Sequence, residues 1–232
     1  VNMAPVSASE MGELKNYLDL SYRLGLLSAQ MIKGQSLKSA EVIYRGEAAN
    51  KKTRLLTNAM TAGLLEAALA ESVNVINAMS VAQARGIHIV ETASDDCENF
   101  ASMISVVLTT DQGTFEASGT IFGNQFLRLV RLNEYHFEAY LDGLLLIYRH
   151  RDVPGLIGFI GTVFGEHNVN IGQMALGRKL AKPGGASVAV LNLDNEPSAE
   201  SIQKIKGHKE VTGVDIVRLP AAGAPLPWLT AK

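Results

Sequence analysis

Hydrophobic residues recur at helical spacing in the first part of the chain. Residues 11–33 carry a stripe of leucines three and four positions apart, and residues 53–71 are rich in leucine and alanine. A shorter helix is predicted over residues 74–87, where Gly86 is suited to the C-terminal end. Because side chains three or four residues apart share one face of a helix, each segment can bury one side against a core.

Strand-type patterns lie between and after these helices. The segment 36–49 alternates around Val42 and Tyr44 and predicts one strand. Further β-type runs follow, and turn sequences such as Asp-Gln-Gly separate them. These runs cover residues 88–93, 103–110, 115–123, 126–132 and 136–143. The first part of the chain is therefore predicted to be a mixed α/β domain.

After Gly143, strands and helices follow the order βαββαβ, which is the ferredoxin-like arrangement. Ser198 is a suitable N-cap for the second helix, and Gly207 is a suitable residue for its end. The predicted strands cover residues 144–150, 169–179, 186–194 and 212–219, and the predicted helices cover residues 154–167 and 198–207.

This order of elements predicts an α+β fold with two domains. We expect a mixed α/β domain over residues 1–142 and a ferredoxin-like domain over residues 143–219. Residues 220–232 hold three of the seven prolines and are expected to form an irregular tail. Trp228 in this tail is either docked on the surface or mobile.

Composition narrows the range of functions. Apolar residues make up 47% of the chain, as in globular proteins, and the net charge of -2 argues against nucleic acid as the main partner. No apolar run reaches the roughly 20 residues that a membrane-spanning helix needs. Cys97 is the single cysteine, which favours a reducing compartment such as the cytoplasm. No signal-peptide pattern is recognised. Because the chain begins with Val1 rather than Met, we interpret it as a fragment of a longer protein.

The sequence predicts neither a metal site nor a catalytic nucleophile. Its five histidines lack the His-x-x-x-His spacing of a zinc site, and no Gly-x-Ser-x-Gly segment is present. Cys97 lies in an acidic turn, which disfavours a reactive thiolate. The segment 158–165, GFIGTVFG, is not a dinucleotide-binding loop, because its glycines fall inside a predicted helix rather than between a strand and a helix.

The segment 150–155, HRDVPG, is the strongest candidate for a ligand site. Pro154 is suited to the first helical position, and the amides at that helix end can receive a carboxylate. Asp152 can pair with an ammonium group, and His150 adds a hydrogen-bonding group, so the turn suits an α-amino acid. The alternative is that Asp152 only caps the helix and His150 only ends a strand.

The predicted helix 154–167 has two distinct faces. Six apolar residues fall on an arc of about 160°, which we expect to face the sheet. They are Leu156, Ile157, Phe159, Ile160, Val163 and Phe164. Gly158, Gly161 and Gly165 cluster on an arc of about 60° on the far side. These glycines either face solvent or allow a partner subunit or domain to approach, and we favour the partner.

Basic residues mark two further places where an anion can bind. Arg128 and Arg131 lie on one predicted strand and point to opposite faces, so solvated edge charges are the alternative. Lys51, Lys52 and Arg54 open the predicted helix 53–71, where positive charge is unfavourable unless an anion offsets it.

Several of these segments resemble a known protein family. Residues 150–174 closely resemble the start of an ACT domain, a module that senses small molecules in amino-acid metabolism. Residues 1–31, 72–87 and 117–132 resemble the intervening, or allosteric substrate-binding, domain that precedes the ACT domain in the longer form of D-3-phosphoglycerate dehydrogenase. The resemblance covers about residues 1 to 219.

The resemblance implies a regulatory role. The parent enzyme would oxidise 3-phosphoglycerate with NAD in the first step of L-serine synthesis. Its catalytic residues and its dinucleotide-binding loop lie upstream, so this chain would be the C-terminal regulatory half, without a cofactor of its own. It would sense L-serine, assemble into a homo-oligomer, and transmit binding to the catalytic domains.

The resemblance also assigns roles to particular residues. L-serine would bind between ACT domains of two subunits, with Asn170 contributed from across the interface. The other effector residues would be His150, Asp152, Pro154, Gly155 and Leu156. An anionic effector, such as phosphate or the substrate, would bind the intervening domain at Arg128, with Arg131 as a looser candidate.

Two alternative functions remain open from the sequence. The first is the matching regulatory part of an iron–sulfur L-serine dehydratase, which uses a related pair of domains. The second is an assembly module with a vestigial ligand site.

Overall fold

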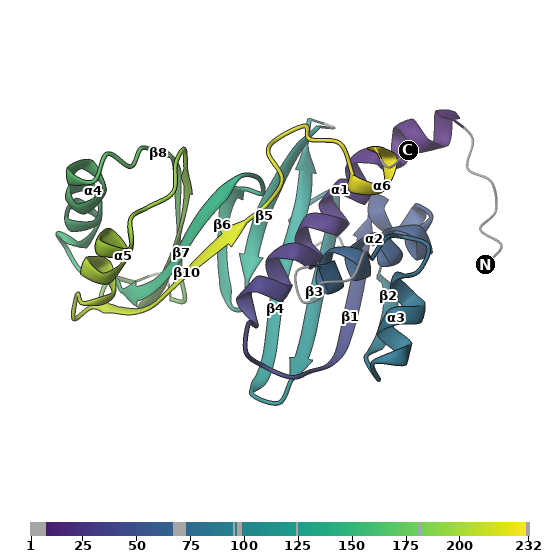
Figure 1. Ribbon diagram of the computed structural model, residues 1–232, viewed down its shortest axis with the longest axis horizontal. Helices are drawn as coiled ribbons and strands as arrows, with labels where there is room; N and C mark the ends of the chain where they lie inside the picture. Colours follow the sequence, from purple (N-terminus) through teal and green to yellow (C-terminus); the bar gives the residue numbers. More distant parts are fainter. Residues whose placement is uncertain are drawn as a thin grey trace. The chain divides into compact units, whose positions relative to one another are not determined.

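The computed structural model describes residues 8–66, 73–94, 96, 99–123, 125–180 and 182–230. The chain divides into two compact units, which are described separately (Figure 1). The first unit comprises Val1–Arg128 and Gly223–Lys232, and the second comprises Leu129–Ala222. Within the described part, no helix is both long enough and apolar enough to cross a membrane.

A six-stranded mixed sheet begins in the first unit. Its order is β2-β1-β3-β4-β5-β6, in which β1 is parallel to β2 and antiparallel to β3. The strands are β1 (Leu37–Gly46), β2 (His88–Ser94), β3 (Ser102–Thr110), β4 (Gly113–Phe122), β5 (Phe126–Leu132) and β6 (Tyr135–Tyr140). This confirms the mixed α/β character of the N-terminal part.

Helices α1 (Ala8–Met31) and α2 (Thr53–Glu66) pack on the apolar side chains of this sheet. Tyr44 of β1 is fully buried, and its hydroxyl lies 2.7 Å from the hydroxyl of Thr57 in α2. Helix α3 (Ala78–Ala84) follows, and Gly86 has a φ of 73°, which confirms its place at the C-terminal end of that helix. Residues 67–71 of the predicted long helix lie outside the described residues.

Two boundaries predicted in the first unit were wrong. The strand predicted over 36–49 ends at Gly46, where φ is 61°, and a 3₁₀ turn, η1 (Glu47–Asn50), follows. The left-handed backbone at Gly46 turns the chain out of the sheet although the alternating pattern continues. The helix predicted over 74–87 begins only at Ala78.

The second unit contains the predicted ferredoxin-like arrangement. Four strands form an antiparallel sheet in the order β10-β7-β9-β8, and helices connect them in the order βαββαβ. The elements are β7 (Leu144–Arg151), α4 (Leu156–Glu166), β8 (Ile171–Arg178), β9 (Ala186–Leu193), α5 (Ala199–Lys206) and β10 (Val211–Arg218). The Ser198 hydroxyl oxygen accepts a hydrogen bond from Ser201 N at 3.1 Å, which confirms the predicted N-cap.

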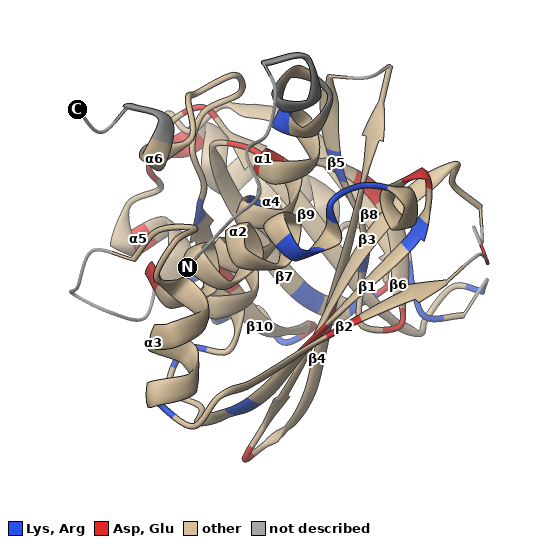
Figure 2. Cartoon of the chain, turned by 90° about the vertical axis from the view of Figure 1, so that its right-hand side faces the viewer, with Lys and Arg blue, Asp and Glu red and all other residues tan. Residues whose placement is uncertain are grey.

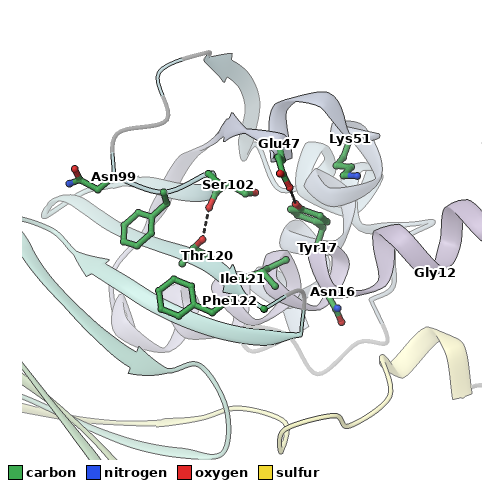
Figure 3. A pocket seen from close by; sticks show the side chains of 13 residues that line it. Gly12, Asn16, Tyr17, Glu47, Lys51, Asn99, Ser102, Thr120, Ile121 and Phe122 are labelled. Atoms are coloured by element: carbon green, nitrogen blue, oxygen red, sulfur yellow. Dashed lines mark hydrogen bonds between the residues drawn. The ribbon is translucent and has the colours of Figure 1, made fainter.

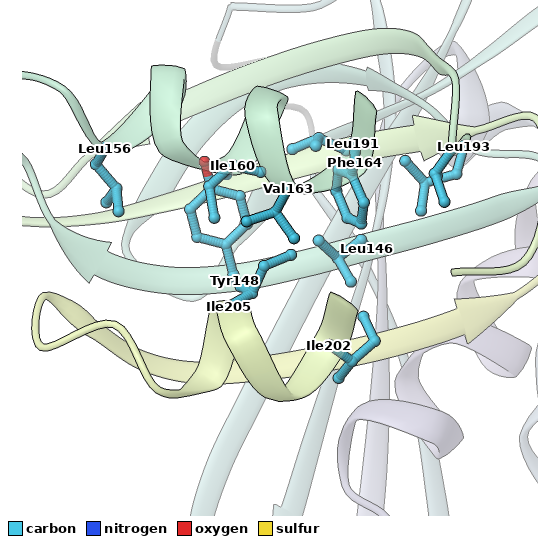
Figure 4. Close-up of a cluster of buried hydrophobic side chains, with 12 residues drawn as sticks. Leu146, Tyr148, Leu156, Ile160, Val163, Phe164, Leu191, Leu193, Ile202 and Ile205 are labelled. Carbon is cyan, nitrogen blue, oxygen red and sulfur yellow. The ribbon is translucent and has the colours of Figure 1, made fainter. Parts of the chain in front are cut away.

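Side chains of β7, β9, α4 and α5 form the core of this sheet (Figure 4). Leu156, Ile160, Val163 and Phe164 of α4 are buried in it, as the helical pattern predicts. Ile157 is an exception, since 50% of its surface is exposed. Ile157 is exposed because it lies at the edge of the apolar arc and in the first turn of the helix. The core side chains that cover the centre of the arc do not extend to this position.

The C-terminal tail is more ordered than predicted. Residues Pro227–Thr230 form a helical turn, α6, and the Trp228 ring meets the Tyr22 ring edge-on at a centroid distance of 5.1 Å. Leu226 exposes only 2% of its surface. The prediction of an irregular tail was therefore wrong for this part, because apolar residues between the prolines pack on the first unit.

The contact division falls within β5, before the boundary proposed at residue 142. Strand β6 lies against the ferredoxin-like sheet, since Gln173 Nε2 donates to Glu138 O at 3.1 Å and Asn192 Nδ2 donates to Tyr140 O at 3.2 Å. Figure 2 shows acidic and basic residues scattered over helices, strands and loops, in keeping with the net charge of -2.

Candidate functional site

The turn between β7 and α4 presents backbone amides at a helix N-terminus. Gly155 is the N-cap residue, with a φ of 87°, and no side chain forms a capping hydrogen bond there. The helix bonding begins with Phe159 N donating to Gly155 O at 2.9 Å. The amides of Leu156 and Ile157 precede this bond and have no carbonyl within α4 to reach. This end of α4 can therefore receive a carboxylate.

Pro154 does not occupy the predicted first helical position. Gly155 adopts the left-handed region, so α4 begins at Leu156 and Pro154 lies in the turn before it. Gly155, with its positive φ, lies between Pro154 and the first helical residue. The preference of proline for a helix start therefore gave a start that is too early in the sequence.

Asp152 is held beside the turn by an arginine from β8. Arg178 Nε lies 2.7 Å from Asp152 Oδ2, an ion-pair contact that lacks hydrogen-bond alignment. The Asp152 backbone is fixed as well, since its N–H donates to Gly185 O at 2.9 Å and its carbonyl accepts from Gly184 N at 2.9 Å. Asp152 forms no cap at the start of α4, so the capping alternative was wrong.

Arg178 was not predicted from the sequence as part of this site. Its position follows from strand pairing, in which Arg178 lies opposite Ser187 of β9 and Ser187 lies opposite His150 of β7. A contact set by the register of three strands leaves no local pattern in the sequence.

His150 lies on the helix-covered side of β7. It exposes 5% of its surface, and its ring centroid is 5.1 Å from that of Tyr148. Its Nδ1 lies 2.9 Å from Arg151 O, whereas Nε2 is buried without a hydrogen-bond partner among the described residues. Ser187 Oγ, on the strand beside it, is also buried and unpaired there. Such atoms are costly unless a ligand or water pairs with them.

The structure does not bring Leu156 and Asn170 into this turn as side chains. Leu156 exposes 2% of its surface and packs in the core, so only its backbone can face a ligand. Asn170 precedes β8 at the opposite end from Arg178, and its Nδ2 donates to Asp194 Oδ2. At about 3.4 Å per residue along β8, Asn170 is roughly 27 Å from the Arg178 end.

The three glycines of α4 lie on an open face. A Cβ added to Gly158, Gly161 or Gly165 would meet nothing within 4 Å, and all three residues are exposed. The prediction that they do not pack against their own sheet is confirmed. Ile157 lies on the same exposed side of the helix.

Among the described residues, no group of three His, Cys, Asp or Glu side chains is placed to hold a metal ion. Cys97 lies outside the described residues.

Comparison with known proteins identifies the family. The family model described as "D-3-phosphoglycerate dehydrogenase intervening domain" matches residues 13–133, a little over half of the 232 residues. The chain belongs to the D-3-phosphoglycerate dehydrogenase family. It corresponds to the C-terminal regulatory part, which includes the intervening domain.

Curated D-3-phosphoglycerate dehydrogenases match across most of this chain. The protein from Methanocaldococcus jannaschii is 34% identical over 94% of the chain and 41% of its own length. Those from Archaeoglobus fulgidus and Bacillus subtilis are 31% and 28% identical, with 41% of each relative covered. The chain thus spans about two fifths of the length of these relatives. A solved homoserine dehydrogenase from Thiobacillus denitrificans is 14% identical over 54% of the chain and 36% of its own, with a TM-score of 0.27 that establishes no common fold.

The two arginines predicted to bind an anion in the D-3-phosphoglycerate dehydrogenase intervening domain both lie on β5. The Arg128 guanidinium is 5.5 Å from the centroid of the exposed Phe126 ring, and its Nη1 donates to Leu127 O at 3.0 Å. Arg131 Nε donates to Asn133 O at 3.1 Å. They point to opposite faces of the strand, so one small anion cannot contact both side chains on one face.

Proposed function

We propose that this chain is the non-catalytic regulatory part of an NAD-dependent D-3-phosphoglycerate dehydrogenase of L-serine biosynthesis. It binds L-serine between ACT domains of two subunits and mediates assembly of a homo-oligomer in the cytoplasm. NAD and the substrate bind parts of the parent enzyme outside this chain. The family membership and the turn between β7 and α4 support this proposal.

The observation that carries the proposal is that one turn holds both an uncapped helix end and the Asp152 carboxylate. The amides at the start of α4 suit the carboxylate of an amino acid, and Asp152 beside them suits its ammonium group. The unpaired Nε2 of His150 and Oγ of Ser187 supply buried polar groups next to the turn. A hydroxylated amino acid offers donors and acceptors for these atoms.

The position of Asn170 supports a site shared by two subunits. Within one chain Asn170 is at the far end of β8 from the turn, so it reaches a ligand there only as a residue of a second copy. The exposed glycine face of α4 leaves room for close approach of such a copy. Two shared sites would make serine binding and assembly mutually dependent.

An anionic effector, phosphate or the phosphorylated substrate, is proposed to bind the intervening domain at Arg128. A guanidinium is suited to bidentate contact with phosphate oxygens. The match to the intervening domain of the dehydrogenase family argues against the L-serine dehydratase alternative. An assembly module without a ligand remains the second candidate, and the open glycine face favours it.

Calorimetric titration of L-serine into the chain tests the serine site. We expect saturable binding that is at least about tenfold weaker for L-alanine, which lacks the hydroxyl group, and for the Asp152→Ala variant. Absence of heat with millimolar L-serine would leave assembly as the only role.

A matched variant separates loss of the site from general damage. Asp215 of β10 also pairs with an arginine of the same sheet, since Arg149 Nη1 lies 2.9 Å from Asp215 Oδ2. Asp215 lies away from the turn, so Asp215→Ala should leave serine affinity unchanged. Equal losses for Asp152→Ala and Asp215→Ala would place the effect on the fold rather than on the ligand.

A further inference from the structure

A cavity lies in the first unit, where the N-terminal half of α1 meets the ends of β3 and β4 (Figure 3). Its volume is about 630 Å³, within the range of small-molecule sites. Residues from α1, η1, the segment before β3, and the end of β4 line it. Neither the turn between β7 and α4 nor Arg128 contributes to this lining.

The polar end of the cavity carries one positive and one negative side chain. Lys51 and Glu47 both line it, and Tyr17 lies between them in Figure 3. The Tyr17 hydroxyl donates to Glu47 Oε2 at 3.3 Å, and Lys51 Nζ is 5.6 Å from the Tyr17 ring centroid. A charged carboxylate accepts more than one hydrogen bond, so Glu47 can also receive an ammonium group.

The start of α2 adds positive potential near Lys51. Lys51 precedes the first residue of that helix, Thr53, and a helix N-terminus favours negative charge. The two opposite charges together suit a zwitterion rather than a simple anion.

One part of the cavity wall is apolar, although Asn16, Asn99, Ser102 and Thr120 also line the space. Phe100 and Phe122 lie with their ring centroids 6.3 Å apart and tilted by 34°, and Ile121 also lines the space. An aromatic or branched side chain of a ligand can pack on these groups, because aromatic contacts at this range are favourable.

We propose that this cavity binds an α-amino acid with an apolar side chain. Lys51 pairs with the ligand carboxylate, Glu47 receives the ammonium group, and Phe100 and Phe122 contact the side chain. This site is separate from the proposed L-serine site and selects a different amino-acid class.

Calorimetry with L-phenylalanine and its two single-charge analogues tests the ligand chemistry on the unmodified chain. L-Phenylalanine should bind at least about tenfold more tightly than 3-phenylpropionate, which lacks the ammonium group, and 2-phenylethylamine, which lacks the carboxylate. L-Alanine, which carries both charges and a small side chain, should also bind at least about tenfold more weakly. Absence of saturable L-phenylalanine binding, or analogues that bind as tightly, would overturn the proposal.

Two variants should each lose affinity for a different pair of ligands. Lys51→Met should weaken L-phenylalanine and 3-phenylpropionate about tenfold and leave 2-phenylethylamine unchanged, and Glu47→Gln should weaken only the two amines. Lys52→Met is the matched control, because the neighbouring Lys52 does not line the cavity. Equal effects of Lys51→Met and Lys52→Met would contradict a site at Lys51.

Asp152→Ala separates this cavity from the ACT-type turn. The variant should leave L-phenylalanine binding unchanged even where L-serine binding is lost. Loss of both ligands in Asp152→Ala would assign L-phenylalanine to the turn and overturn the proposal. Thermal unfolding at unchanged temperature verifies that each variant remains folded.

Discussion

Gly25 of α1 lies directly against the carbonyl oxygen of Met60 in α2. A Cβ added at Gly25 would overlap this oxygen, and a Cβ added at Gly63 would overlap the carbonyl oxygen of Tyr22. The backbones of the two helices therefore approach so closely at their crossing that a residue larger than glycine does not fit. We expect Gly25→Ala to lower the free energy of unfolding by about 1–3 kcal/mol, because the backbones must separate. Urea denaturation measures this change.

Gly12→Ala is the control for this crossing. Gly12 lies in the same helix, and an added Cβ there would meet nothing within 4 Å. Replacement of a helical glycine by alanine should then stabilise by up to about 1 kcal/mol. Similar losses for Gly12→Ala and Gly25→Ala would mean that the crossing tolerates a methyl group.

Much of the fold follows from local patterns. The βαββαβ order was readable because each strand and helix keeps its own period. Ser198 marked a helix start through its capping hydroxyl, and Gly86 marked a helix end through its positive φ. The start of α4 was misplaced because proline and glycine both fit a helix entrance, and only the left-handed φ at Gly155 decides between them.

The candidate site was predictable only in part. The turn residues Asp152 and Gly155 are neighbours in sequence, so their proximity could be inferred. Arg178 reaches Asp152 through pairing of strands that are distant in sequence. The separation of Asn170 from the turn likewise depends on strand direction, which residue types alone do not encode.

Tyr148 provides a test of the core beneath α4. Its hydroxyl is buried and has no hydrogen-bond partner among the described residues. Removal of this oxygen in Tyr148→Phe should raise the free energy of unfolding at neutral pH by about 1 kcal/mol, because an unpaired buried hydroxyl is destabilising. A loss of stability of similar size would show that the hydroxyl is paired in solution.

The same side chain predicts a loss of stability at alkaline pH. Burial raises the pKa of Tyr148 from 10.0 to about 12. Between these values the unfolded chain binds fewer protons than the folded chain, so the free energy of unfolding falls as pH rises above 10. Tyr148→Phe should reduce this slope. Denaturation at a series of alkaline pH values measures it, and equal slopes for both chains would contradict the assignment.

The ion pair between Asp152 and Arg178 should matter little for stability. Arg178 exposes 50% of its side chain and Asp152 exposes 23%, so solvent screens the pair. Asp152→Ala should therefore change the free energy of unfolding by less than about 1 kcal/mol. Chemical denaturation of the variant checks this, and a larger loss would mean that its serine titration cannot be interpreted as an effect on the site.

The open face of α4 predicts how assembly depends on glycine. If a second copy approaches Gly161 closely, Gly161→Leu should leave the helix intact, since nothing lies within 4 Å of its added Cβ, and should prevent the approach. Light scattering should then report a smaller mass, and L-serine binding should fall because the second subunit's Asn170 is withdrawn. Gln203→Leu places the same side chain on an exposed position of α5 and should change neither quantity. Unchanged mass and serine affinity in Gly161→Leu would exclude the glycine face from the interface and leave its glycines exposed to solvent.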